Sequence, residues 1–427
     1  IAVAAEVKFS QPERYSKIRL PHIHSWAPVY FNYDNVESIS GDDYYKTASL
    51  GATALFQNLL GTGYGMVGYG AHEDPYEDGK WRHSGHIKYC YTGLLPIFEI
   101  SADFNDRAAM DIQKIQVTKE RMYRLYNKGT LTDKPYFEGG LKVYIPFNFS
   151  SGGINRGLIP QVKYKFTNDR YNDQILFQHI VKKDGKDVTE TYSTIGENNI
   201  SPLQTLDASI RGYVMRQKAP SQVFPSLGFG AELGFHFRPG HMKAYNPTAY
   251  LYTYGYLPGF TARQGLRLTA SMEVWYGPYE EGGIMEGALT AIPRGFVDTN
   301  LKSIINSCSE SRWRVTADYA IPFADVDWSF LSPVAYVKNF ELTPFFDWSY
   351  QTFSWNHELH YNPGAVMGEN LFSVGADLTV RLGNFFWLPY DTQIGIRYAR
   401  NFWHYIDRFP IANLNKDYIG WIFSINL

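Results

Sequence analysis

The residues of this chain that are capable of chemistry are scattered, and none of them forms the pattern of a catalytic centre. His22, His24 and Ser25 lie near the start of the chain, and the adjacent carboxylates Asp42 and Asp43 follow them. The sequence has no Gly-x-Ser-x-Gly elbow, no His-Glu-x-x-His and no Walker loop, which are the patterns that present a nucleophile, a zinc ion or a phosphate. We therefore expect no enzyme activity, no metal and no cofactor.

Charged residues recur in the last third of the chain, where two carboxylates and three arginines fall in neighbouring segments. Asp347 and Asp377 could act together as an acid–base pair, with Arg294, Arg381 and Arg397 nearby in the sequence. An ion pair is the simpler account, because a guanidinium stays charged and its fork of donors fits a carboxylate. We interpret these residues as structural ion pairs.

The segments that must position these side chains show apolar and polar residues alternating with period two. From Trp26 onward there are about sixteen of them. A strand sends successive side chains to opposite faces, so each such segment has one apolar and one polar face. In residues 312–322 the apolar face holds Trp313, Val315, Ala317, Tyr319 and Ile321, and the polar face holds Arg314, Thr316 and Asp318. A barrel wall with lipid outside and water inside has this pattern.

Composition supports a transmembrane barrel rather than a helical membrane protein. The 427 residues include 17% aromatic and only 19% charged residues, yet the mean hydropathy is -0.30. No run of 18 apolar residues occurs, which excludes a membrane-spanning helix. Abundant Tyr and Trp suit the aromatic girdles of a barrel with a wet interior. The net charge of -2 gives no reason to expect nucleic acid as a partner.

The lengths of the connections alternate between short and long along the chain. Short ones fall at 58–63 and 150–154, and long ones at 107–135, 168–203, 277–311 and 353–368. Bacterial barrels have an even number of strands, short periplasmic turns and long outer loops. We therefore expect an antiparallel transmembrane barrel over residues 24–427, with both ends on the periplasmic side of an outer membrane. Residues 1–23 are expected to be a lead-in from an upstream region.

The alternation also assigns the two faces of each predicted strand. The lumen should be lined by Glu341, Thr343, Phe345, Asp347 and Ser349, and by Ser373, Gly375, Asp377, Thr379 and Arg381 on the next strand. A lysine or arginine on the lipid face at mid-depth costs about 2–4 kcal/mol, so the near-absence of charge on the opposite faces fits a membrane wall. The alternative is a large soluble all-β protein.

Three motifs resemble the BamA-type superfamily of outer-membrane assembly and translocation barrels. Gln57-Asn-Leu-Leu-Gly-Thr-Gly-Tyr-Gly65 is similar to the turn between that family's second and third strands. Pro293-Arg294-Gly295-Phe296, followed by Asp318-Tyr-Ala-Ile-Pro-Phe323, resembles the family's sixth outer loop and the strand after it. Tyr418-Ile-Gly420-Trp-Ile-Phe423-Ser-Ile425 resembles a C-terminal assembly signal, although Ile425 and the extra Asn426-Leu427 depart from its usual aromatic end.

This resemblance implies that the sixth outer loop folds back into the lumen and carries Arg294 with it. A guanidinium taken inside needs carboxylate partners. The inferred lumen face offers Asp318, Glu341, Asp347 and Asp377. We expect Arg294 to pair with Asp347, with Asp377 or with both; the alternative is an arginine in a solvent-exposed loop.

In a closed barrel the first strand must pair with the last, and the resemblance makes this seam a candidate gate. The seam residues are Trp26 and Pro28 at the start and Gly420, Trp421 and Phe423 at the end. Proline donates no backbone hydrogen bond, so Pro28 would weaken the seam. The alternative is that Pro28 simply begins the strand.

The two cysteines, Cys90 and Cys308, are too few for a disulfide scaffold. One bond between them and two unrelated thiols are both compatible with the sequence.

By this resemblance the expected function is to insert other proteins into the outer membrane, or to pass them across it, through the seam between the first and last strands. The expected partners are outer-membrane lipid and other outer-membrane or periplasmic proteins. The alternative is a passive barrel that acts as an anchor, as a scaffold in a surface complex, or as a pore.

Overall fold

The computed structural model describes most of the chain and contains almost only β-structure. The described residues are 22–32, 48–74, 77, 79–119, 123–172, 176–183, 186–193, 200–219, 221–239, 247–275, 292–296, 309–330, 332, 334–353, 367–385, 391–404 and 415–426. Their one helical element is a single 3-10 turn, η2 (Arg294–Phe296). None of the helical structure described is long and apolar enough to cross a membrane.

The described residues form nineteen strands, which belong to one sheet. They are β1 (His22–Phe31), β2 (Ala48–Gln57), β3 (Gly63–Glu73), β4 (Trp81–Tyr91), β5 (Ile97–Lys119), β6 (Tyr123–Tyr144), β7 (Phe147–Asn148), β8 (Ile154–Asn172), β9 (Leu176–Lys183), β10 (Lys186–Ser193), β11 (Ile200–Arg216), β12 (Gly228–Phe237), β13 (Thr248–Pro258), β14 (Gly265–Trp275), β15 (Ser309–Trp328), β16 (Tyr336–Phe353), β17 (Met367–Gly383), β18 (Asp391–Phe402) and β19 (Asp417–Asn426).

The strands form an antiparallel meander in which each long strand pairs with the next along the chain. The two-residue β7 continues β6 along β8, and β9 and β10 form a separate hairpin between β8 and β11. Setting these three aside leaves sixteen wall strands among the described residues. The all-β barrel architecture predicted from the alternation is confirmed.

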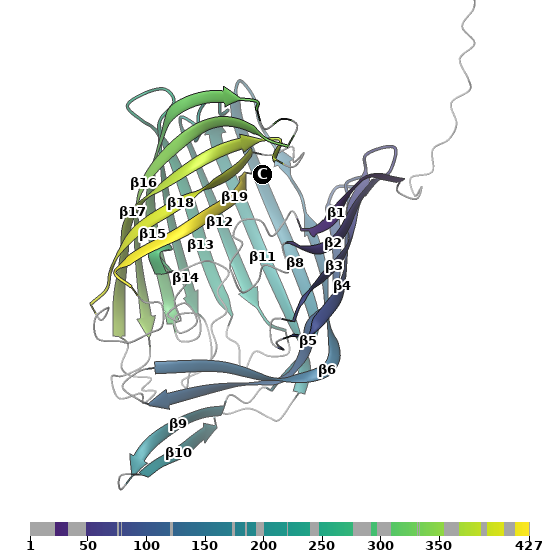
Figure 1. The fold of residues 1–427 in the computed structure, drawn as a ribbon, viewed down its shortest axis with the longest axis vertical. Helices are drawn as coiled ribbons and strands as arrows, with labels where there is room; N and C mark the ends of the chain where they lie inside the picture. Colours follow the sequence, from purple (N-terminus) through teal and green to yellow (C-terminus); the bar gives the residue numbers. More distant parts are fainter. Residues whose placement is uncertain are drawn as a thin grey trace, which may run out of the picture.

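The wall curves around an interior but stays open between its first and last strands (Figure 1). Among the residues that the structure describes, no backbone pairing joins β1 to β19. The expectation that these two strands pair is therefore wrong for this conformation. Pro28 lies within β1, where the register with β2 shifts between Ala27 and Val29, so it does not merely begin the strand. A proline and a shifted register both disturb the row of donors that a partner strand would need.

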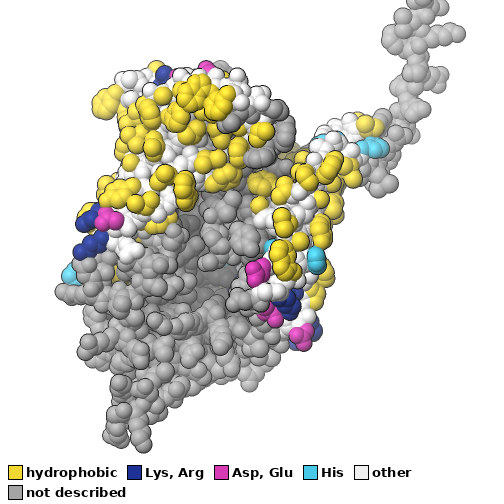
Figure 2. All heavy atoms as spheres, in the orientation of Figure 1, with side chains coloured by type: hydrophobic (Ala, Val, Ile, Leu, Met, Phe, Trp, Pro, Cys, Tyr) yellow, Lys and Arg dark blue, Asp and Glu magenta, His cyan; other side chains and the backbone are white. Residues whose placement is uncertain are grey.

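Burial in this wall is inverted relative to a soluble protein. Asp347, Ser349 and Ser373 are fully buried (0% exposed), whereas Leu378 is 49% and Trp421 83% exposed. Hydrophobic side chains spread over the outer face of the wall, and charged ones gather mainly toward the end with the long connections (Figure 2). This confirms the predicted assignment of polar side chains to the inside and apolar side chains to the outside.

The connections differ in length between the two ends of the wall. The chain segments at one end are short, for example 58–62, 92–96 and 259–264. Those at the opposite end include 276–308 and 354–366. The predicted alternation holds for most of the meander, but 217–227 at the short-turn end is longer than 74–80 and 238–247 at the opposite end. β1 begins and β19 ends at the short-turn end.

Two segments that were expected to be connections are partly strands. β5 continues to Lys119 and β6 begins at Tyr123, so most of the polar stretch 107–135 is a long hairpin. Within 168–203 lie the end of β8, the β9–β10 hairpin and the start of β11. Both segments lack an apolar face, so the sequence pattern gave no sign that their backbones pair with each other. Residues 1–21 of the predicted lead-in lie outside the described residues, and β1 already includes His22 and Ile23.

Candidate functional site

The loop motif of residues 293–296 lies inside the barrel. Phe296 is fully buried and Ile292 is 1% exposed. The peptide N–H of Phe296 donates to the carbonyl of Pro293 at 3.0 Å, which closes the turn of η2. This turn contacts β17, β18 and β19 from within. The described part of the loop between β14 and β15 is therefore attached to the interior of the last strands.

Arg294 is held by two buried aspartates on neighbouring strands. Its Nε donates to Oδ2 of Asp347 at 2.9 Å, its Nη2 donates to Oδ1 at 2.6 Å, and its backbone N–H donates to Oδ2 at 2.8 Å. Its Nη1 lies 2.6 Å from Oδ1 of Asp318. The guanidinium also lies 3.9 Å from the ring centre of Phe345, within cation–π distance. Of the four predicted partners, Asp318 and Asp347 have the most buried carboxylates, and both contact Arg294.

Further arginines complete what we call the arginine cluster: Arg267, Arg294, Arg314, Arg397, Asp318, Asp347 and Asp377. Arg397 binds Asp377 through two hydrogen bonds of 2.8 Å, and Arg294 stands 4.0 Å from the same carboxylate. Arg314 lies 3.2 Å from Asp347, and Arg267 lies 3.0 Å from Asp318. Each buried carboxylate therefore has at least one arginine partner, as a low-dielectric interior requires.

Glu341 was a candidate partner of Arg294, and that expectation is wrong. Its carboxylate pairs instead with Arg381 at 3.2 Å and accepts a hydrogen bond from Thr343 at 3.0 Å. In the β16 ladder Glu341 lies six residues from Asp347, nearer the short-turn end. The loop motif enters from the opposite end, so Arg381 on the adjacent strand is the closer cation.

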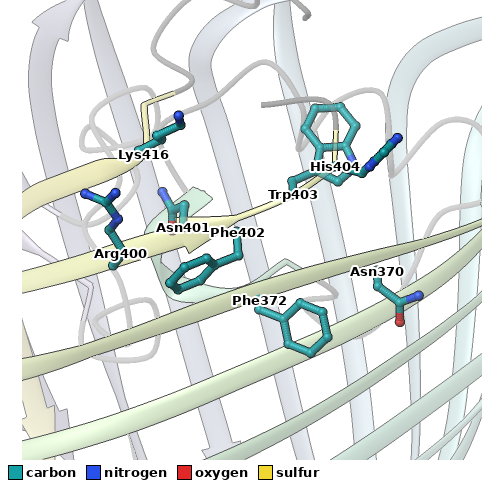
Figure 3. Close-up of a pocket in the computed structure, with 8 residues that line it drawn as sticks. All are labelled: Asn370, Phe372, Arg400, Asn401, Phe402, Trp403, His404 and Lys416. Atoms are coloured by element: carbon teal, nitrogen blue, oxygen red, sulfur yellow. The ribbon is translucent and has the colours of Figure 1, made fainter. Parts of the chain in front are cut away.

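Gly295 fits where no larger residue would. Its carbonyl accepts a hydrogen bond of 2.7 Å from the side-chain amide of Asn401, and a Cβ at this position would collide with Asn401 and Ser373. Asn401 was not among the predicted site residues. Its inward position could have been found from the parity of β18, because it lies four residues beyond Arg397. Asn401 also borders an outer pocket between β17, β18 and β19 that Phe372, Arg400 and Lys416 help to line (Figure 3).

The predicted seam residues lie on the two strands that flank the opening. Trp26 in β1 is 72% exposed, and Trp421 in β19 is 83% exposed. On its paired side β19 is bonded to β18, with Gly420 opposite Arg397 and Phe423 opposite Ile394. The opening thus has one apolar strand edge on each side.

The remaining candidate residues do not form a site. Ser25 Oγ lies 2.6 Å from Nδ1 of His24, but both side chains are exposed neighbours, and Asp42 and Asp43 lie outside the described residues. Cys90 is a buried free cysteine, and Cys308 lies outside the described residues, so the structure does not show the disulfide bond. Cys90 lies in β4 at the short-turn end.

The fold of this chain is similar to that of several solved structures, among them CdiB and BamA. The sequence matches no family model and no curated protein sequence. The structure is similar to CdiB from Escherichia coli, with a TM-score of 0.45 and 9% identity, over 89% of this chain and 59% of that one. It is also similar to BamA from Haemophilus ducreyi lacking POTRA domains 1–3, with a TM-score of 0.41 and 10% identity, over 89% and 68% of the two chains. The chain therefore spans less than two thirds of the CdiB chain. Because both TM-scores are below 0.5, the function proposed below rests on the residues of this chain.

Proposed function

We propose that this chain is a bacterial outer-membrane barrel that inserts other proteins into that membrane, or passes them across it, at the opening between β1 and β19. The observation that carries the proposal is the lack of pairing between these strands among the described residues. It leaves two strand edges with backbone donors and acceptors available to an incoming segment.

Strand edges in a membrane wall need a partner. In hydrocarbon each unsatisfied N–H or C=O group costs several kcal/mol, so an open edge is a strong template for another strand. An extended segment of a client protein can add to such an edge through main-chain hydrogen bonds. The exposed Trp26 and Trp421 place an apolar surface beside each edge, where the outer side chains of a client strand would meet lipid.

The arginine cluster has a supporting role in this proposal. Arg294 pairs with Asp318 on β15 and Asp347 on β16, and the η2 turn contacts β17, β18 and β19, so the loop is attached to the wall on the β19 side of the opening. Among the described strands β1 is bonded only to β2 and β19 only to β18, but β19 is also contacted by the attached η2 turn. Movement at the opening is then confined mainly to β1 and its neighbours.

Localisation and partners follow from the same proposal. The apolar outer face requires a lipid bilayer, and short turns at one end match the periplasmic side of outer-membrane barrels. Both strand ends, His22 and Asn426, would then face the periplasm, where client proteins arrive. The partners would be outer-membrane lipid and other outer-membrane or periplasmic proteins.

A reversible cross-link across the opening tests the function. The native cysteines are first replaced by serine, and Val29→Cys and Trp421→Cys are introduced. The barrel is then reconstituted in liposomes and offered an unfolded outer-membrane protein as client. Oxidation should reduce client folding to the rate of empty liposomes, and a reductant should restore it.

The matched control is the pair Leu378→Cys and Ile396→Cys, whose positions already face each other across β17 and β18. Cross-linking there should leave client folding unchanged. Full client folding by the oxidised Val29–Trp421 pair would show that the opening is not the insertion route.

A passive barrel is the alternative that the polar lumen favours, since water-filled interiors are typical of pores. A pore predicts ion conductance in planar bilayers that rises when Arg294→Ala frees the loop segment. A scaffold predicts partners that co-purify stably, whether or not the opening is cross-linked.

A further inference from the structure

A second charged group lies inside the barrel on the side of the first strands. His86 on β4 and Asp103 and Asp106 on β5 bring one ring nitrogen and two carboxylate oxygens within 4.8 Å of one another. In the part of the chain that the structure describes, this is the only set of three such residues close enough to share a metal ion. We call it the histidine cluster.

A break in β5 brings Asp106 into this cluster. Residues an odd number apart face opposite sides of a regular strand, so Asp103 and Asp106 should point apart. The pairing of β5 with β6 shifts register between Phe104 and Ala108, and Asn105 has a φ of 65°. A bulge of this kind re-aims a side chain, and bulges are enriched beside functional sites. Here it turns a second carboxylate toward His86.

The surroundings resemble the shell of a metal site more than an open surface. The side chain of His86 is 3% exposed and that of Asp106 is 7%, whereas Asp103 is 28% exposed and leaves a path from the lumen. Ser84 Oγ lies 2.9 Å from Nε2 of His86, and the backbone carbonyl of Asp106 bonds to His72 at 2.8 Å. Partners of this kind fix the orientation of ligand side chains.

The charges of the histidine cluster call for a cation. A single imidazole does not balance two carboxylates in a largely buried place, although Nδ1 of His86 lies 2.7 Å from Asp103 and Nε2 lies 3.4 Å from Asp106. The neighbouring arginines are engaged with other carboxylates, since Arg82 pairs with Asp74 and Arg107 with Asp169. A divalent ion would cancel both charges.

We propose that His86, Asp103 and Asp106 bind one divalent transition-metal ion of the zinc or manganese class. Imidazole with carboxylates is a ligand set that such ions accept, and open positions would be filled by water. The ligand atoms of a tetrahedral zinc ion stand roughly 3.4 Å apart, so the three side chains would rotate inward from their present separations of up to 4.8 Å to reach the ion.

Metal binding would also affect β1, the strand that flanks the opening of the barrel. Tyr30 of β1 stacks on the His86 ring with the ring centres 3.9 Å apart, and it is 1% exposed. An ion that fixes the imidazole therefore fixes the surface on which β1 rests. Occupancy should make β1 more rigid.

Cobalt titration of the folded, detergent-solubilised barrel tests the site. The protein is purified without a polyhistidine tag and stripped with a chelator, and the visible absorption of bound Co²⁺ is followed. One equivalent should bind and be displaced by Zn²⁺. Asp106→Asn and His86→Ala should each weaken binding at least about 100-fold, since even the loss of an outer-shell partner costs 10–100-fold.

His83→Ala is the matched control, because His83 lies on the exposed outer face of the same strand. It should bind cobalt like the unchanged protein. Equal affinity of the unchanged protein and Asp106→Asn would refute the site.

A measurement on the unchanged protein avoids any folding defect of the variants. Zn²⁺ should slow amide hydrogen exchange in residues 22–31 at least about 10-fold relative to the chelated protein. Exchange that is the same with and without Zn²⁺ would refute the coupling of the ion to β1.

Discussion

The arginine cluster and the histidine cluster solve the same problem, charge inside a membrane barrel, in different ways. In the arginine cluster each aspartate pairs with a guanidinium. The central guanidinium, that of Arg294, belongs to the loop between β14 and β15 and not to a strand of the wall. In the histidine cluster two carboxylates lie against one imidazole. The carboxylates on one side of the barrel are balanced by arginines, and those on the other side would be balanced by the proposed metal ion.

The strands that contact the two clusters also differ, because the histidine cluster, which lies on β4 and β5, stacks against Tyr30 of the edge strand β1. β15, β16 and β17 have 17 to 20 residues and pair on both edges. β1 has 10 residues, pairs on one edge only, and shifts register twice. The arginine cluster thus lies on strands within the wall, whereas the histidine cluster supports a strand at the opening. The other strand at the opening, β19, likewise has 10 residues and pairs only with β18 among the described strands.

Removing Arg294 should produce the largest effect, because it leaves Asp347 and Asp318 buried without their main partner. Losing one member of a buried ion pair costs about 3–5 kcal/mol. Arg294→Ala should lower the free energy of unfolding by this order, measured by urea unfolding in lipid vesicles with Trp fluorescence. Arg400→Ala, which removes a fully exposed ion pair with Asp417, should cause no measurable change. Equal stability of the two variants would remove the contrast between buried and exposed pairs.

A charge on the outer face should be equally costly on both sides of the barrel if both face lipid. Val67 on β3 is 47% exposed and Leu378 on β17 is 49% exposed. Val67→Arg and Leu378→Arg should each destabilise the folded barrel by about 2–4 kcal/mol in vesicles. The Asn370→Arg variant, nearer the loop end of β17, is the control and should cost less. A penalty on β17 alone would show that β3 does not face the bilayer.

Adding a side chain at Gly295 tests how closely the η2 turn packs against the wall. Gly295→Ala should cost about 1–3 kcal/mol, because the new Cβ would collide with Asn401 and Ser373. Limited proteolysis should then cleave the loop 276–308 faster than in the unchanged protein. Gly212→Ala, whose Cβ would meet only ordinary contacts, should behave normally. Unchanged proteolysis of Gly295→Ala would mean that the contact does not hold the loop.

The smallest effect is expected at Gly68, beneath the Tyr30 ring. A Cβ there would lie 2.6 Å from Tyr30 Cδ2, and the ring can yield in part because β1 is free on one edge. Gly68→Ala should cost about 1 kcal/mol and raise hydrogen exchange in β1 without affecting β17. Gly85→Ala on β4, where a Cβ meets nothing within 4 Å, is the control. A global rather than local increase in exchange would contradict the independence of the two sides.

Much of the wall could be predicted because its physical signal is local. Alternation of apolar and polar residues gave both the strands and their faces, and parity placed Asp347 and Asp377 inside. The partner set of Arg294 also followed from parity, except that Glu341 is taken by Arg381. The polar hairpins of β5–β6 and β9–β10 could not be predicted, since neither has an apolar face to mark it.

By itself the sequence determined which side chains face inward, because a strand alternates its faces whatever lies around it. Only the tertiary structure decided where the wall stays open and which inward groups meet. Pairing of β1 with β19 depends on segments almost 400 residues apart, and the turn of Asp106 toward His86 depends on a bulge at Asn105. The alternation of apolar and polar residues does not indicate whether a sheet closes or where its register shifts.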